Sequence, residues 1–349
     1  MSANRITAGS ASARPAPVGD GRKAVVLITL CCLLTLVAAW SVTLGTARFP
    51  FSRVLDAIFA FDGSREHLVI ASIRLPRMLA GLLAGAGLAV AGAIMQAVTS
   101  NPLASPGLLG INAGAAFAVV VAIAAFGAGS DDIHVWSAFA GAVAAAATVQ
   151  VLGSAGRSGG SPLRLVLAGA VLAGFLTSLT TAILIFDQGT LDIVRLWTAG
   201  TLSGRSMAQV AAVSPYILTG LAAALALRRH VTTLSLGPDV ARSLGQSLPL
   251  WRGLAVAIVI LLAGGAVALA GPIGFVGLVV PHVARFCVGV DYRWIIPFSA
   301  LGGALLLVIA DTGGRVLLGS QSFPAGVTMA LIGGPFFIWL ARYRVGGRP

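Results

Sequence analysis

Charged residues are few in this sequence. Charged residues make up 10% of its 349 residues, whereas 57% are apolar. A soluble domain has roughly a quarter charged residues, so an ordinary soluble fold is excluded. Apolar stretches of about 20 residues recur, which is the length that a helix needs to cross a bilayer, and the short alternating segments of a membrane barrel are lacking. The sequence therefore predicts an all-α polytopic membrane protein.

Residues that carry catalytic or metal chemistry are also few. Lys23 is the only lysine and stands at the start of the first apolar run, so the chain cannot supply the lysine of an ATP-binding P-loop. No HExxH zinc motif occurs, the four histidines lie far apart, and Cys31, Cys32 and Cys287 form no CxxC pair. We therefore expect no catalytic residue, no metal site and no cofactor in this chain.

Ten apolar segments predict membrane helices. They lie near 24–44, 75–97, 108–128, 134–156, 163–186, 207–227, 252–271, 274–284, 296–313 and 325–341. The first is too long for the apolar part of a typical signal peptide, which is the alternative, so we expect an uncleaved helix. The eighth is short and follows Gly271-Pro272, which suggests a half-span buried in protein.

The chain begins with a segment of different composition. Residues 1–22 are rich in Ser, Ala, Gly and Pro, which predicts a disordered cytoplasmic tail. Residues 23–345 then form the predicted transmembrane domain.

The placement of basic residues predicts the orientation. With the N-terminus in the cytoplasm, fifteen of the 23 Lys and Arg residues and three of the 11 acidic residues lie on the inner side. This bias matches the positive-inside rule. We therefore expect a multi-pass protein of the inner (plasma) membrane with both termini cytoplasmic, whose basic face meets anionic lipid and binds no nucleic acid.

The few acidic residues also bear on the energy source. Proton- or sodium-coupled carriers usually keep acidic residues near the bilayer midplane, whereas here they cluster at span ends, with Asp187 and Asp311 as possible exceptions near the outer ends. This favours a transporter driven by a separate ATPase, and an ATP-independent carrier or channel is the alternative. Residues 87–94 and 266–273 resemble each other, as halves of transporters often do.

Several sequence blocks carry a family resemblance. They are Arg74-Leu75-Pro76-Arg77, Gly85 to Gly92, Gln96, Asn101 to Gly110, Leu234 to Gly245, Ala270 to His282, Ala310 to Arg315, Pro324 to Val327 and Gly333 to Phe337. In order and spacing they resemble the FecCD family, the type II ABC permeases that import iron–siderophore complexes, haem and vitamin B12. The match covers about residues 24–342. Ser100 and Ser322-Phe323-Pro324 depart from the family pattern, and residues 196–205 are most similar to ferric-catecholate permeases.

The resemblance implies the type II ABC importer permease fold and a set of partners. These are a second permease subunit, either identical or paralogous, two ATPase subunits that hold ATP and Mg²⁺, a substrate-binding protein and the lipid bilayer. Iron–siderophore is the implied substrate, with haem and cobalamin as alternatives.

The resemblance also implies site residues. Arg74, Arg77 and Arg315 would dock the binding protein at the outer mouth, where guanidinium groups suit carboxylates. Ser161, Pro162 and Leu163 would form a cytoplasmic gate. The motif positions without an assigned role are Gln96, Asn101, Pro102, Gly271, Pro272, Pro281 and His282.

The segment 234–246 predicts a short capped helix in a basic inner loop. Pro238 suits the first helical position, Asp239 is favourable at the positive end of the helix dipole, and Gly245 can end the helix. The resemblance makes this the coupling helix that docks into the ATPase. Its residues are Leu236, Gly237, Asp239, Ala241, Arg242, Leu244 and Gly245.

Overall fold

The computed structural model describes residues 19–45, 47–127, 131–154, 162–318 and 323–345, and these form helices joined by turns and loops. The helices are α1 (Asp20–Thr43), α2 (Phe51–Phe59), α3 (Arg65–Val69), α4 (Leu75–Thr99), α5 (Ile111–Phe126), α6 (Asp131–Ser154), α7 (Pro162–Phe186), α8 (Gln188–Thr198), α9 (Met207–Ala226), α10 (Arg228–Ser235), α11 (Pro238–Ser243), α12 (Leu248–Val259), α13 (Gly265–Ala270), α14 (Val276–Val288), α15 (Tyr292–Leu318) and α16 (Ala325–Val345). Two π-helical turns, Ile70–Arg74 and Ile260–Gly264, join α3 to α4 and α12 to α13, and a 3-10 turn spans Pro106–Leu109.

The ten predicted spans coincide with the apolar helices of the structure. Seven helices in the described part are long and apolar enough to cross a membrane, and three shorter apolar ones lie at Ile111–Phe126, Val276–Val288 and Ala325–Leu340. Sequence periodicity did not predict the additional short helices α2, α3, α8 and α10. The first helix begins at Asp20, inside the predicted N-terminal tail, and residues 1–18 lie outside the described part.

Helix α4 forms the centre of the molecule. It contacts α9, α10, α12, α13, α14 and α15. Of the residues in its most apolar stretch, 78% are buried. Small residues let the neighbouring backbones approach closely, as is usual between membrane helices. A Cβ atom on Gly92 would lie only 2.0 Å from the Gly277 carbonyl oxygen of α14, and one on Gly85 only 2.3 Å from that of Gly303 in α15.

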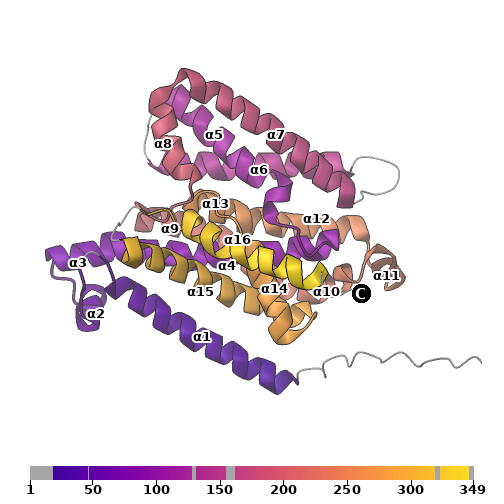
Figure 1. The fold of residues 1–349 in the computed structure, drawn as a ribbon, viewed down its shortest axis with the longest axis horizontal. Coiled ribbons are helices and arrows are strands. Elements are labelled where there is room, and N and C mark those ends of the chain that lie inside the picture. The colour runs from indigo at the N-terminus through magenta and orange to yellow at the C-terminus, as the bar shows by residue number, and fades with distance from the viewer. Residues whose placement is uncertain (1–18, 46, 128–130, 155–161, 319–322, 346–349) are drawn as a thin grey trace, which may run out of the picture.

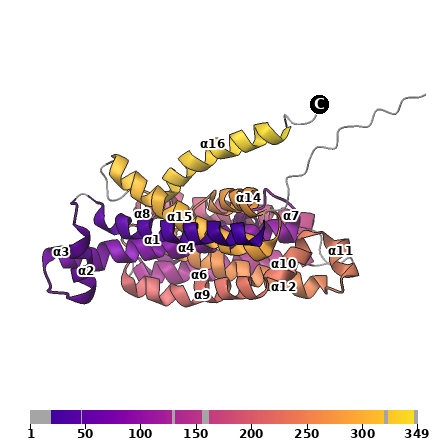
Figure 2. The ribbon, with the colours of Figure 1, turned by 90° about the horizontal axis from the view of Figure 1, so that it is seen from below.

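The helices are arranged in two groups, with α5, α6, α7 and α8 packed on one side of the central α4 (Figure 1). Both views place α2 and α3 at one end of the molecule and α11 at the other (Figures 1 and 2). We call these the α2–α3 end and the α11 end. The described chain begins and finishes at the α11 end, as an even number of spans requires.

Helix α14 is too short to cross a bilayer by itself, as the sequence predicted. Its 13 residues are about 20 Å long at about 1.5 Å per residue, less than the hydrocarbon thickness of about 30 Å. The chain reaches its N-terminus through the non-helical residues 271–275, and the first residues of α14, Val276 and Gly277, are buried. Residues 87–94 are helical throughout, whereas 266–273 are helical only as far as Ala270, and that the two segments form a repeat stays a prediction.

Candidate functional sites at the two ends of the molecule

The three predicted docking arginines gather at the α2–α3 end. Arg77 of α4 binds Asp311 of α15 with two hydrogen bonds, from Nε to Oδ2 at 2.9 Å and from Nη2 to Oδ1 at 2.8 Å. Arg315, one turn along α15, brings its Nε to 3.4 Å from the same carboxylate. Hydrogen bonds between charged groups are stronger than those between neutral groups, and the bidentate arrangement also fixes their geometry. Asp311 thus joins α4 to α15.

Arg74 and Arg315 also hold the end of α1. Arg74 donates from Nη1 to the carbonyl oxygens of Val42 and Thr43 at 2.7 and 2.9 Å, and Arg315 donates from Nη2 to that of Ser41 at 3.3 Å. The last carbonyl groups of a helix have no partners within it and form the negative end of its dipole. The two guanidinium groups therefore cap α1 and fix it against the helices that carry them.

This geometry corrects one expectation. Docking at the outer mouth would need arginines that a partner can reach, but Arg74 and Arg77 are each 4% exposed and Asp311 is 5% exposed. The end of α1 and the loop after it contact Arg74, and the end of α1 also contacts Arg315. That these arginines dock a binding protein stays a prediction. Asp311 was noted only as an acidic residue near a span end, although its i,i+4 spacing to Arg315 was a usable signal.

The unassigned motif residues lie where the helices break. Gln96 of α4 donates from Nε2 to the Gly277 carbonyl at 3.2 Å, and Asn101 accepts from the Leu103 amide at 2.9 Å. The two non-helical segments that follow Asn101 and Gly271 face each other across a cavity of about 240 Å³, lined by Ser105, Asn112 and Phe275 among others. The two sequence blocks, far apart in the chain, therefore form one internal feature.

The remaining motif residues belong to the same region. Pro102 follows Asn101 in the loop after α4, and Gly271 and Pro272 begin the segment between α13 and α14. Pro281 and His282 lie within α14 and are buried, and the His282 Nδ1 is 3.3 Å from the Leu278 carbonyl oxygen. A proline inside a helix removes one backbone hydrogen bond.

The helix of the predicted coupling segment lies between two glycines and is capped at its C-terminal end. Gly237 precedes α11 with φ +100°, and Gly245 follows it with φ +77°; side chains other than glycine rarely adopt such values. The Gln246 amide donates to the Ala241 carbonyl at 3.0 Å and the Gly245 amide to that of Arg242 at 2.9 Å, which is the Schellman pattern of helix ends. The helix begins at Pro238, as predicted, and residues 234–237 of the segment form the end of α10 and the turn before α11.

Helix α11 presents apolar side chains to the outside. Leu236, Val240 and Leu244 are 56%, 43% and 62% exposed, whereas Ala241 is fully buried against the rest of the molecule. Asp239 and Arg242 form an exposed ion pair at 3.3 Å, which contributes little to stability. An apolar surface on a rigid, capped element suits contact with another protein.

The predicted gate is only partly described. Pro162 begins α7 and Leu163 is 67% exposed, whereas Ser161 lies outside the described residues.

Two polar caps were not predicted. Asp187 precedes α8 and accepts from the Thr190 hydroxyl and amide, and the hydroxyl hydrogen bond is the main cause that lowers the pKa of Asp187. Asp62 accepts from the Ser64 amide, which lowers its pKa, and lies 2.8 Å from the Nδ1 atom of buried His67. Asp62 stabilises the turn before α3, whose N-cap is Ser64, and the Asp62-Gly63-Ser64 triplet is a turn signal that could have found it.

The comparisons with known proteins cover nearly all of the chain. The family model described as the FecCD transport family matches residues 33–343. The chain belongs to the FecCD transport family. It is a multi-pass membrane permease.

Among its relatives, the probable siderophore transport system permease protein YfiZ of Bacillus subtilis is 44% identical over 92% of this chain and 96% of its own length. The ferric enterobactin transport system permease protein FepD of Escherichia coli is 41% identical over 93% of this chain and 97% of its own length. A solved structure described as an inward-facing conformation of a metal-chelate type ABC transporter superposes with a TM-score of 0.80 at 27% identity, covering 92% of this chain and 99% of that one. These matches agree with the predicted family, fold and class of function.

Proposed function

We propose that this FecCD permease imports a ferric siderophore, driven by a separate ATPase that binds ATP and Mg²⁺. The substrate is supported by four relatives that are 41–44% identical, which are named for the transport of siderophore, iron(3+)-hydroxamate, Fe(3+)-citrate and ferric enterobactin. These names favour a ferric chelate over haem or cobalamin. No protein-bound cofactor of this chain is part of the proposal.

The coupling role rests on the α11 end. An ATPase that contacts Leu236, Val240 and Leu244 would press on a helix whose Ala241 is buried. Helix α11 contacts α10, and α10 contacts the central α4, so a displacement of α11 has a continuous packed route to the core. Gly237, Asp239, Arg242 and Gly245 would act by shaping and capping this element.

The orientation and the docking role rest on the charges. The α11 end would face the cytoplasm of the inner membrane, because the inward excess of basic residues lies in its loops. The α2–α3 end would then meet the binding protein. Arg74, Arg77 and Arg315 outnumber Asp311 there, so acidic side chains of a partner could share the cluster if the end of α1 moved aside.

Two further parts of the assembly follow from exposed apolar helices. Only 6% of the residues in the most apolar stretch of α7 are buried. The C-terminal part of α16 stands away from the other helices (Figure 2). Large exposed apolar surfaces of this kind mark contact with lipid or protein, and we assign these to the second permease subunit. Ser161, Pro162 and Leu163, at the α6–α7 junction, would then gate the path.

The proposed substrate is tested by identifying the small molecules that co-purify with the permease. The permease is purified with its associated subunits from iron-starved cells, and bound small molecules are identified by mass spectrometry. We expect a ferric siderophore, and a matched preparation of a FecCD-unrelated membrane protein should lack it. Recovery of haem or a corrinoid in its place would reject the proposed substrate.

A further inference from the structure

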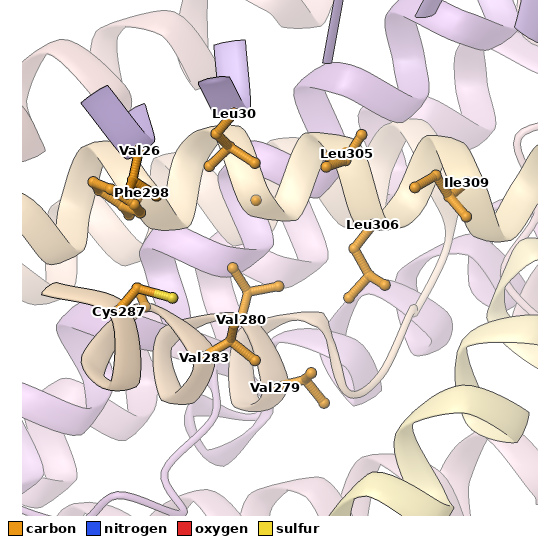
Figure 3. A pocket seen from close by; sticks show the side chains of 12 residues that line it. Val26, Leu30, Val279, Val280, Val283, Cys287, Phe298, Leu305, Leu306 and Ile309 are labelled. Atoms are coloured by element: carbon orange, nitrogen blue, oxygen red, sulfur yellow. The ribbon is translucent and has the colours of Figure 1, made fainter. Parts of the chain in front are cut away.

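An apolar groove runs along the outside of the molecule between α1, α14 and α15. It has a volume of about 300 Å³ and is lined by apolar side chains, with Cys287 as the one sulfur atom among them. Side chains from the three helices surround it, including Val26, Val283, Phe298 and Ile309 (Figure 3). Its lining contributes nothing to the sites described above.

The groove has the length and depth of one bilayer leaflet. It follows α15 from Phe298 to Ile309, a rise of about 16 Å at about 1.5 Å per residue. The hydrocarbon core of a bilayer is about 30 Å thick, so one leaflet is about half of that. The groove therefore matches one acyl chain of a leaflet in length.

Positive charge lies where the groove meets the α11 end. Lys23 is one helical turn from Val26 on α1, and Trp294 is one turn from Phe298 on α15. The Lys23 Nζ lies 5.7 Å from the centre of the Trp294 ring, so the two residues together close that end of the groove. Tryptophan is enriched at the level of lipid headgroups, which places Lys23 at the height of a phosphate.

The charge at this end exceeds that of the acidic residue beside it. Lys23 is paired with Asp20 at 3.2 Å, but the Asp20 side chain is 78% exposed, and an exposed pair of this kind is weak. Arg22 and Arg293, both exposed, flank the pair on α1 and α15. Asp291 also lies beside Arg293, so three basic residues face two acidic ones, and an anionic headgroup finds a net positive charge here.

We propose that the groove is a binding site for an anionic phospholipid, with one acyl chain between α1, α14 and α15 and the phosphate beside Arg22 and Lys23. The apolar lining accepts the chain, and the basic residues distinguish an anionic from a zwitterionic headgroup. Each basic residue near an anionic surface strengthens binding by roughly fivefold. Removing both should weaken binding of the anionic lipid by roughly 25-fold.

The test measures lipid binding to the full-length permease by native mass spectrometry. Phosphatidylglycerol and phosphatidylcholine with the same acyl chains are titrated separately into delipidated protein. We expect tighter binding of phosphatidylglycerol, which the Arg22→Gln/Lys23→Gln double variant should lose. An Arg229→Gln/Arg342→Gln double variant removes the same charge from exposed positions outside the groove and should retain the preference. Equal binding of the two lipids, or equal losses in the two variants, overturns the proposal.

The position of the lipid has its own control. Val283→Trp fills the groove from its rim, where the side chain is 43% exposed, and should reduce phosphatidylglycerol binding, whereas Val121→Trp, at 39% exposure on α5, should not. In a Cys31→Ser/Cys32→Ser background, phosphatidylglycerol should also slow maleimide labelling of Cys287. Unchanged labelling places the lipid elsewhere. Oxidative cross-linking of Cys287 between two copies would show that a second protein molecule occupies the groove, which also overturns the proposal.

Discussion

At the scale of single residues, Arg77 and Asp311 form a buried ion pair between α4 and α15. Both are almost fully buried, so neither can be solvated if the other is removed. The same carboxylate is near Arg315, which also binds the end of α1. Asp311 therefore acts as the shared counter-ion of a cluster that joins three helices.

We expect Asp311→Asn to destabilise the protein strongly. Removing one partner of a buried ion pair typically costs about 3–5 kcal/mol, because a buried charge is left without compensation. The measurement is the thermal unfolding midpoint of the purified permease. Asp239→Asn, which alters an exposed pair with Arg242, is the control and should leave Tm unchanged. Equal Tm values for the two variants would show that the Arg77–Asp311 pair is not structural.

The sequence predicted these arginines as a set but not their environment. Their spacing and the Leu75-Pro76 between two of them identify the family motif. The burial of Arg74 could not be inferred, because it depends on the end of α1 lying over it. The hydrogen bonds of Arg74 to Val42 and Thr43 span 32 and 31 positions in the sequence. Arg77 and Asp311 are 234 positions apart, and no local pattern links them.

At the scale of helices, the glycine contacts of α4 decide how closely α14 and α15 approach. A Cβ atom on Gly92 would overlap the Gly277 backbone, whereas one on Gly174 in α7 would meet nothing within 4 Å. The two positions are both glycines within long apolar helices. They therefore make a matched pair.

We expect Gly92→Ala to lower stability and Gly174→Ala to preserve or raise it. Overpacking a tight contact costs about 1–3 kcal/mol, while alanine is the better helix former by up to about 1 kcal/mol. Tm values of the two purified variants, compared with the unmodified protein, check this. The packing account fails if Gly92→Ala is as stable as Gly174→Ala.

Helix α11 gives a second prediction at this scale. Leu244→Glu should leave folding intact, because the side chain is 62% exposed, but it should abolish stimulation of ATP hydrolysis by the loaded binding protein. Leu244→Met keeps an apolar side chain and should retain it. ATPase activity of the reconstituted complex is the measurement. Normal stimulation in the Glu variant would mean that the ATPase does not contact this surface.

The sequence predicted much of helix α11 but less of the short helix α14. Pro238, Asp239 and Gly245 are local signals, and local signals determine a short capped helix. The start of α11 at Pro238 agrees with the first helical position that the sequence predicted. The short α14 was foreseen from Gly271-Pro272, but its contact with Gln96 of α4 is a long-range one that periodicity does not reveal.

At the scale of the whole molecule, the account requires the two ends to lie on opposite sides of the membrane. Cysteine substitutions in a background without the native cysteines test this with a membrane-impermeant maleimide on intact spheroplasts. Phe59→Cys in α2 should react from outside, and Ser243→Cys in α11 should react only after permeabilisation. Labelling of position 243 in intact spheroplasts would reverse the proposed orientation.

The architecture was predictable from sequence because membrane spans are long local signals. The ten apolar segments define the helices, and their number places both ends of the chain on one side. How they pack was not predictable, since α4 becomes central through glycine contacts with helices more than 180 residues away in sequence.

The central claim is that ATP hydrolysis by a partner drives import through this chain, and transport in proteoliposomes tests it most directly. The permease is reconstituted with its ATPase, ATP is enclosed on the α11 side, and iron-loaded siderophore with its binding protein is added on the other. We predict accumulation of iron that requires ATP, the ATPase and the binding protein, and that persists when proton and sodium gradients are collapsed. Accumulation without the ATPase, driven by an ion gradient, would contradict the account.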